Sequence, residues 1–350
     1  MKRILLVKLT SLGDLIHTLP ALTDASLAHP DLQCDWAIDE GFSEVALWHT
    51  AVAKIFLTNH RKWRTNPIAS IPSIYRLAKT LRSQSYDLII DGQGNFKSAL
   101  LTLLANGVRA GFDRESVRES IAQYAYHKKY SASWKIHAID RLRRLFSGAL
   151  NYPLPATPPD FSIQQDRFIK PSFDLPPSFL VFIHSATWET KLWPEEHWIE
   201  LMRKVDLPIL LPWGNEQEKE RGARLAAASP NAILLPKLSL SEMGYILSRA
   251  KACVSVDTGL SHLAAALKVP CVTLYGATDA GIIGASGQNQ LHLQAKRFCA
   301  PCNQKKCRYA SSSLNSPCMV EITPDWVFAS LTEARALNIC NKPCGHCKER

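Results

Sequence analysis

Residues 3–22 read RILLVKLTSLGDLIHTLPAL, and this stretch decides the fold class. Residues 3–9 form an apolar run typical of a short buried strand, and a polar turn follows at residues 10–13. An apolar-periodic segment then begins beside Asp14, an acid suited to a helix N-terminus. The stretch therefore predicts a strand, a turn and a helix in succession.

The same unit recurs along the chain, so the sequence predicts an α/β fold with parallel, doubly wound sheets. Residues 151–177 hold seven prolines and are predicted to form an interdomain linker, after which the alternation restarts. We expect domains over 1–160 and 161–298 and a cysteine-rich, partly helical segment over 299–350. The further strands are predicted at 34–38, 55–57, 86–91, 179–184, 208–212, 232–235, 252–256 and 271–275, and the helices at 71–84, 97–105, 194–205, 216–228, 240–250 and 261–267.

Composition and charge limit which classes of function the protein can have. The chain has 350 residues, 46% of them hydrophobic and 21% charged, so it can bury enough apolar surface to fold. Lys8 interrupts the N-terminal apolar run, and no other run approaches the length of a membrane-spanning helix, so we expect a soluble, cytoplasmic protein. Residues 54–144 carry 17 basic and 6 acidic residues. This excess attracts phosphate on nucleic acid, a membrane or a small substrate, unless it is only a solvated face.

One loop of the second predicted domain is suited to phosphate binding. A strand ends at Val256, and Thr258, Gly259 and Ser261 begin a helix of small residues. Backbone N–H groups, hydroxyls and the positive helix end would face the ligand there, with His262 on the first turn. Ordinary helix capping by Asp257 and Thr258 is the alternative interpretation.

Two further loops follow strands of the same domain. Residues 184–195 place Thr187 and Lys191 before a helix, where they could hold a diphosphate. In residues 211–218, Trp213 could cover a base and Glu218 could bind a ribose, although a core tryptophan and a helix-start acid are common. Three such loops at one sheet edge favour a nucleotide site. The glycine fingerprint of a dehydrogenase and the Walker motif are both absent from the sequence.

Five segments, in order, resemble glycosyltransferase family 9, the lipopolysaccharide heptosyltransferases. They are KLTSLGDLIHTLPALTD (8–24), DWAIDEGF (35–42), KLWPEEHW (191–198), LPWG (211–214) and DTGLSHL (257–263). The resemblance extends from residue 1 to about residue 290. It implies a GT-B fold, in which two Rossmann-like domains face each other across a cleft, with the acceptor bound by the first domain and ADP-heptose by the second.

The resemblance also implies a reaction. L-glycero-D-manno-heptose would pass from ADP-heptose to the first Kdo (3-deoxy-D-manno-octulosonic acid) of Kdo2-lipid A, with inversion and without a metal or cofactor. Asp14 matches the general base, Lys191 the lysine that neutralises the leaving diphosphate, and Glu218 the acid that holds the ribose. Ala186 stands where a hydroxyl residue is expected. The expected donor-binding residues are Thr187, Lys191, Trp213, Glu218, Asp257, Thr258, Gly259 and His262, and the expected acceptor-binding residues are Thr10, Ser11, Gly13, Arg61, Arg64, Lys97, Arg118, His137 and Arg141.

The implied partners are ADP-L-glycero-D-manno-heptose, Kdo2-lipid A and the anionic cytoplasmic face of the inner membrane, on which the enzyme would act as a peripheral monomer. Another family 9 enzyme with a different ADP-sugar or acceptor, such as heptosyltransferase II, is the alternative. A nucleic-acid-binding protein built on the basic segment is a second alternative, which predicts salt-sensitive binding. The sequence resembles no nucleic-acid-binding module, so we expect no nucleic-acid partner.

Seven cysteines lie between residues 299 and 347. The spacing of Cys299, Cys302, Cys307 and Cys318 suits a structural zinc site, and these four also resemble a C-terminal element of other family 9 enzymes. His346 is a further candidate ligand. Disulfides and free thiols are the alternatives.

Overall fold

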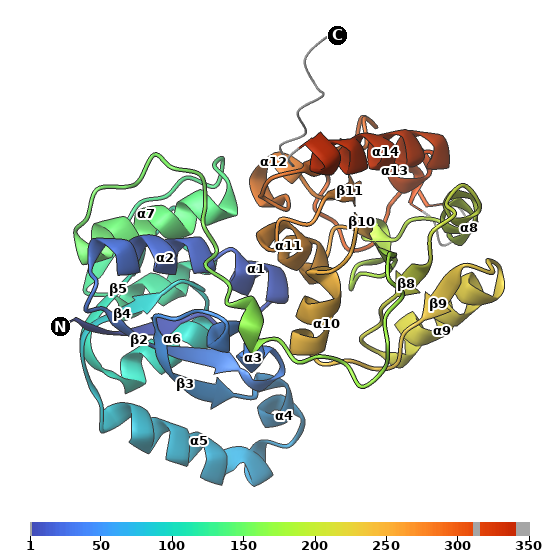
Figure 1. Cartoon of the computed structure of the whole chain (residues 1–350). Helices are drawn as coiled ribbons and strands as arrows, with labels where there is room; N and C mark the ends of the chain where they lie inside the picture. Colours follow the sequence, from blue (N-terminus) through green and yellow to red (C-terminus); the bar gives the residue numbers. More distant parts are fainter. Residues whose placement is uncertain (1, 311–315, 341–350) are drawn as a thin grey trace. The chain divides into compact units, whose positions relative to one another are not determined.

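The protein forms two compact units, residues 1–167 and 168–350, each built around its own sheet (Figure 1). The structure is a computed structural model and describes residues 2–310 and 316–340. The boundary between the units falls inside the proline-rich stretch. None of the helices in the described ranges combines the length and the apolarity needed to cross a bilayer.

The first unit contains a six-stranded parallel sheet with the order β3-β2-β1-β4-β5-β6. Its central strand β1 is the apolar run 3–7, whose residues from Ile4 onward are buried because both sheet faces are covered by helices. The strands are β1 (Arg3–Val7), β2 (Gln33–Asp39), β3 (Val52–Thr58), β4 (Ser85–Asp91), β5 (Asn106–Phe112) and β6 (Lys128–Tyr130).

Two pairs of helices pack in the first unit, α2 with α7 and α5 with α6. α2 and α7 pack against each other and are joined by a buried ion pair, in which Arg143 Nε lies 2.6 Å from Asp24 Oδ2. α5 and α6 share a core cluster with β1 and β4, to which Leu81 and Leu101 contribute. The helices are α1 (Leu12–Ile16), α2 (Leu19–Ala28), α3 (Ser43–Leu47), α4 (His60–Thr65), α5 (Pro67–Arg82), α6 (Phe96–Leu104) and α7 (Ala138–Leu150), with short 3-10 turns at Glu40–Phe42, Ser120–Ala125 and Gln165–Arg167.

The second unit repeats this topology, with strand order β12-β11-β10-β7-β8-β9 and parallel pairing throughout. Its core combines the strands with Trp193, Trp198 and the C-terminal helix α14. The strands are β7 (Leu180–Ile183), β8 (Ile209–Leu211), β9 (Ala232–Leu234), β10 (Ala252–Val256), β11 (Cys271–Tyr275) and β12 (Gln290–Gln294). The helices are α8 (Glu195–Arg203), α9 (Glu216–Ala227), α10 (Leu240–Leu247), α11 (Gly259–Ala266), α12 (Ala280–Ile283), α13 (Pro317–Val320) and α14 (Pro324–Cys340).

In both sheets the strand order reverses next to the first strand of the unit, at β1/β4 and at β7/β10. Loops that leave two strands on opposite sides of such a switch point open a crevice at the carboxyl ends, where α/β proteins bind ligands. The prediction of two doubly wound parallel sheets is confirmed. Every predicted strand is present to within three residues at each end, whereas β5, β6 and β12 were not predicted.

Candidate active site

Asp14 lies on the short helix α1, directly after the loop that leaves β1. The N–H and hydroxyl of Ser11 both donate to Asp14 Oδ2, at 3.0 and 2.9 Å. Thr10 and Ser11 are joined by a cis peptide bond. The carboxylate is therefore held at the switch point of the first sheet, with one oxygen already bound by its own helix cap.

The charges around Asp14 keep it ionised. Burial acts to raise its pKa, but Lys8, the two hydrogen bonds from Ser11 and Arg118 together outweigh burial, so the pKa of Asp14 lies below its usual value. Lys8 is itself buried, and burial lowers the pKa of its ammonium group. Its Nζ donates to Gly92 O at 2.9 Å. A buried lysine therefore favours the ionised form of the candidate base.

The end of the neighbouring strand β4 and the loop after it are hydrogen-bonded to the loop that precedes Asp14. Gln93 Oε1 accepts hydrogen bonds from the backbone N–H groups of Leu9 and Thr10, at 3.1 and 3.2 Å. Asp91, which is fully buried, accepts from the N–H groups of Gln93 and Gly94, both at 2.9 Å. The two loops on either side of the switch point are thus hydrogen-bonded into one platform.

The structure separates the predicted acceptor residues into two groups and the buried Arg141. Thr10, Ser11 and Gly13 surround Asp14, and Arg118 is exposed and close enough to influence its charge. The rings of His137 and His17 meet edge to face with centroids 5.4 Å apart. The second group consists of Arg61 and Arg64 on α4 and Lys97 on α6.

Arg141 is buried, and its donors are used inside the first unit. Its guanidinium donates to the carbonyls of Ala132 and Ser116 and lies 3.4 Å above the ring centroid of Trp134. Burial lowers its pKa to about 10. These contacts suit Arg141 to hold the 113–137 loops in place.

In the second unit, the loop between β10 and α11 carries the residues predicted to bind phosphate. Thr258 is the N-cap of α11 with extended backbone, and its N–H lies 3.4 Å from Ser261 Oγ. Gly259 begins the helix, so the N–H groups of Gly259 and Leu260 lie at this loop, while the Ser261 N–H donates to Thr258 O at 3.1 Å. His262 is buried on the first turn.

Lys191 is held in place by the same loop. Its Nζ lies 2.7 Å from Asp257 Oδ2 and 4.8 Å from the ring centroid of Trp188. Thr278, in the loop after β11, donates to the same oxygen at 2.6 Å, and His262 Nε2 lies 3.7 Å from Oδ1. Burial acts to raise the pKa of Asp257, but His262 and Lys191 outweigh it and hold that pKa well below its usual range.

This arrangement separates the roles of Asp257 and Lys191. Asp257 is 3% exposed, whereas the side chain of Lys191 is 15% exposed. A carboxylate repels a diphosphate, so a buried Asp257 is suited to position the lysine rather than to face the ligand. Thr187 is exposed in the loop before Lys191.

Trp213 and Glu218 lie together at the end of β8. Trp213 is half-buried, and its Nε1 donates to Leu235 O at 2.7 Å. Glu218 accepts from the Gly214 N–H at 2.7 Å and from Asn215 Nδ2 at 2.9 Å, so it closes the turn before α9. Lys219 and Lys237 lie over the Trp213 ring, at 5.2 and 6.0 Å from its centroid.

Several of these residues escaped the sequence-based reasoning. Gln93 was considered only as part of an incomplete glycine fingerprint, and Asp91 only as the last residue of a predicted strand. Thr278 follows a strand whose loop was not considered. A buried lysine at a strand end, Lys8, is an unusual feature that could have been noticed. Thr278 could have been found from the rule that parallel strands of one sheet end at the same edge.

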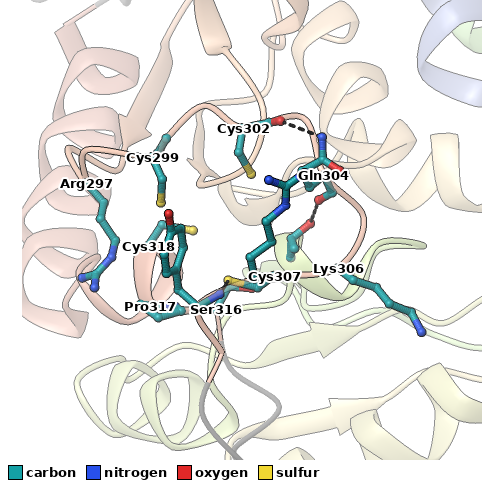
Figure 2. Close-up of a pocket in the computed structure, with 13 residues that line it drawn as sticks. Arg297, Cys299, Cys302, Gln304, Lys306, Cys307, Ser316, Pro317 and Cys318 are labelled. Atoms are coloured by element: carbon teal, nitrogen blue, oxygen red, sulfur yellow. Dashed lines mark hydrogen bonds between the residues drawn. The ribbon is translucent and has the colours of Figure 1, made fainter.

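The four cysteines between residues 299 and 318 line one cavity of about 200 Å³, shown in Figure 2. Each is a free thiol, and burial raises the pKa of Cys318 to about 11. Thr190 Oγ1 donates to Gln304 O at 2.6 Å, which ties this segment to the Lys191 loop. Within the described ranges, no three His, Cys, Asp or Glu side chains are grouped so as to hold a metal ion. Structural zinc stays a prediction, and His346 and Cys347 lie outside the described residues.

Chemically, the two units offer complementary groups. The first presents an ionised carboxylate able to accept a proton, and the second presents a lysine and a helix N-terminus able to stabilise a departing phosphate. Each set of groups, taken by itself, suits one part of a group transfer from a nucleotide to a hydroxyl.

Comparisons with known proteins agree with this chemistry. Residues 74–312 match the family model described as glycosyltransferase family 9 (heptosyltransferase). Lipopolysaccharide heptosyltransferase 1 of Pseudomonas aeruginosa is 46% identical over 313 residues, covering 88% of both chains. The Escherichia coli K12 protein of the same name is 43% identical over 303 residues, covering 84% of this chain and 94% of its own.

The fold is similar to solved heptosyltransferases. The structure of E. coli heptosyltransferase WaaC with ADP matches with a TM-score of 0.82 and 39% identity, covering 95% of this chain and 99% of that one. WaaC with ADP-2-deoxy-2-fluoro heptose matches with a TM-score of 0.79 and 38% identity, with the same coverage. The predicted fold class, two Rossmann-like domains of the GT-B type, is confirmed by these matches.

Proposed function

Because this chain belongs to glycosyltransferase family 9, the heptosyltransferases, we propose that it transfers L-glycero-D-manno-heptose from ADP-heptose to the first Kdo of Kdo2-lipid A in inner-core lipopolysaccharide biosynthesis. The observation that carries the mechanism is the Asp14 carboxylate, kept ionised by Lys8 at the switch point of the first sheet. The choice of donor is supported by the relatives, one of which is solved with an ADP-heptose analogue.

Asp14 acts as the general base. A Kdo hydroxyl gives its proton to Asp14 as its oxygen attacks the anomeric carbon of heptose, and the bond from that carbon to the diphosphate breaks. Attack on the face opposite the leaving ADP inverts the anomeric configuration. The oxygen of Asp14 that Ser11 does not bind is available for the proton.

ADP departs with additional negative charge, which the second unit stabilises. Lys191, oriented by Asp257, and the N–H groups at the start of α11 provide fixed positive potential for the diphosphate. Trp213 and Glu218 bind the adenosine, with the base on the indole ring and the ribose on the carboxylate. We propose that these groups perform the role that a divalent cation performs in metal-dependent transfer.

The test is transfer from ADP-heptose to Kdo2-lipid A or its water-soluble O-deacylated form, followed by mass spectrometry with EDTA present. The expected result is the addition of one heptose, with a rate that EDTA leaves unchanged. Addition only to an acceptor that already carries heptose would assign a different acceptor within the family. A requirement for added metal would contradict the role given to Lys191.

The structural zinc prediction has a separate test. We propose that Cys299, Cys302, Cys307 and Cys318, which line one cavity as free thiols but are not grouped closely enough for a metal ion, draw together to bind zinc in the purified protein. Elemental analysis of protein purified without chelator should then give one zinc per chain. Cys302→Ser should lose it, and zinc-free wild-type protein would refute the site.

A further inference from the structure

Two neighbouring helices of the first unit expose apolar side chains. On α5, Ile68, Ile71 and Tyr75 follow one another at helical spacing and are 82%, 60% and 66% exposed. On the opposite side of the helix, Leu77 and Leu81 reach the core of the unit. α5 therefore has one apolar side that packs inward and a second that faces outward.

α6 has apolar side chains on both sides, since Ala99 and Leu101 are buried while a second apolar stripe is exposed. Phe96, Leu100 and Leu103 are exposed at spacing i, i+4 and i+7, whereas Ser98 and Thr102 are buried. Ser98 Oγ donates to Asp91 and Thr102 Oγ1 donates to Ser98 O, both at 2.8 Å. A surface helix normally turns its polar side to solvent. Packing within the unit therefore does not account for the outward apolar stripe.

The helices that carry the two stripes, α5 and α6, contact each other and contribute to the same core cluster. We name the two stripes together the docking face. It consists of Ile68, Ile71, Tyr75, Lys79 and Arg82 on α5 and Phe96, Leu100 and Leu103 on α6.

The charge on the α5 part of the docking face has one sign, whereas beside the α6 part Glu119 Oε2 accepts a hydrogen bond from the Phe96 N–H at 2.9 Å. From residue 45 to residue 86 the sequence contains no aspartate or glutamate. Lys79 and Arg82 extend the stripe of Ile68, Ile71 and Tyr75 along the same side of α5. Exposed aliphatic and aromatic side chains combined with basic residues are typical of helices that lie on anionic membranes. The basic residues of this segment are Lys54, Arg61, Lys62, Arg64, Arg76, Lys79 and Arg82.

Other partners fit these features less well. A nucleic acid would account for the positive charge but not for isoleucine and leucine stripes, since its surface is polar and charged. A second copy of the chain would bring like charges together at the edge of the contact. An anionic bilayer satisfies both features, with phosphates for the basic residues and acyl chains for the apolar ones.

We propose that the docking face binds the surface of an anionic lipid bilayer, with Ile68, Ile71, Tyr75, Phe96, Leu100 and Leu103 inserted among the lipids. This inference deepens the proposed function and rests on it in one respect, namely that the proposed acceptor is itself a lipid. It identifies which surface of the first unit faces the membrane. Insertion is shallow, as expected of a helix lying in the interface.

The test is co-flotation of the full chain with vesicles of phosphatidylethanolamine and phosphatidylglycerol, compared with vesicles of phosphatidylcholine alone. The wild type should bind the anionic vesicles, and binding should weaken as sodium chloride rises from about 0.1 M to about 0.5 M. The triple variant Ile68→Ser/Ile71→Ser/Tyr75→Ser should bind at least about tenfold more weakly. Since all three side chains are exposed, the variant should fold.

The matched control is Leu27→Ser/Ile169→Ser/Phe298→Ser, which replaces exposed apolar residues elsewhere and should bind like the wild type. Equal binding of the wild type and the docking-face variant would overturn the proposal, as would failure of the wild type to bind anionic vesicles. A wild-type dimer in sedimentation that the docking-face variant converts to monomer would assign the face to a second copy instead.

Transfer to the water-soluble acceptor separates this inference from the proposed function. The docking-face variant should retain wild-type activity there, while its activity on acceptor in vesicles falls. A wild type that binds vesicles but transfers no heptose would refute the proposed function and leave the docking face intact.

Discussion

Asp14 is a residue on which opposed electrostatic effects act. Removal from water favours its neutral form, while Lys8, Ser11 and Arg118 favour its charged form and prevail. The carboxylate is therefore charged throughout the physiological pH range. A low pKa also makes it a weak base in the ground state, so proton transfer must accompany attack of the acceptor oxygen rather than precede it.

Asp14→Asn should reduce transfer by at least about 10²-fold, because the amide cannot accept the proton. ADP affinity should remain that of the wild type, since the proposed nucleotide site belongs to the second unit. The two readouts are kcat from the transfer assay and Kd for ADP by calorimetry. Asp31→Asn, which changes an exposed acid, is the control, and a fully active Asp14→Asn enzyme would exclude the base role.

Lys8→Met should shift the pH dependence of transfer. Because Lys8 lowers the pKa of Asp14, its removal raises that pKa, and the acidic limb of the kcat profile should move to higher pH. The wild type should show no loss attributable to Asp14 between pH 5 and pH 8. Arg118 is a smaller influence on Asp14, so Arg118→Gln should move the limb less; an unchanged limb in Lys8→Met would contradict the coupling.

The same pKa shift affects folding. The pKa of Asp14 is lowered in the folded state, so its ionisation stabilises the fold above the pH at which a free aspartate titrates. This stability is lost as the pH falls through the lowered pKa.

At the scale of the elements, the side chains gathered at the start of α11 come from three different segments. Asp257 directly follows β10, Lys191 lies in the 3-10 turn at Glu189–Lys191, and Thr278 lies in the loop after β11. Three segments distant in sequence thus converge because their parallel strands end at one sheet edge.

Thr278→Val tests whether this convergence positions Lys191. The variant removes the 2.6 Å hydrogen bond to Asp257 and leaves the side chains proposed to bind the nucleotide unchanged. The KM for ADP-heptose should rise by about three- to tenfold, the effect of about 1 kcal/mol of lost hydrogen bonding, and Thr278→Ser should restore it. Lys191→Ala should have a larger effect on the same KM at an unchanged fold by circular dichroism. Wild-type kinetics in Lys191→Ala would exclude the diphosphate contact.

For the whole molecule, the two units have separate cores. Calorimetric unfolding should therefore show two transitions, and ADP should raise the temperature of only one. At 100 times Kd the expected stabilisation is about 2.7 kcal/mol. Met202→Ala, in the core of the second unit, should lower the ADP-sensitive transition, and Ile89→Ala the other. An ADP shift of both transitions together would show that the units unfold as one.

The fold class was predictable because its cause is local. Apolar runs such as 3–7 and 252–256 are buried on both faces, so they stand out from the polar turns that follow them. β5, with two glycines and an arginine, and β12, with alternating polar residues, lack such runs, and pairing with β4 and β11 decides their structure. α1 and α2 were predicted as one segment; Pro20, in the first turn of α2, occupies a position where its missing N–H costs nothing.

The sequence by itself determined the alternation of strands and helices, the positive charge of residues 45–86, and the loops that carry Asp14 and Lys191, because these depend on residue type and spacing. Only the tertiary structure decided that Lys8 lowers the pKa of Asp14, that Thr278 and Lys191 share Asp257, and that α6 leaves an apolar stripe exposed. Those facts depend on which strands are neighbours and which helix face meets the sheet. Contacts between residues far apart in the chain settle both.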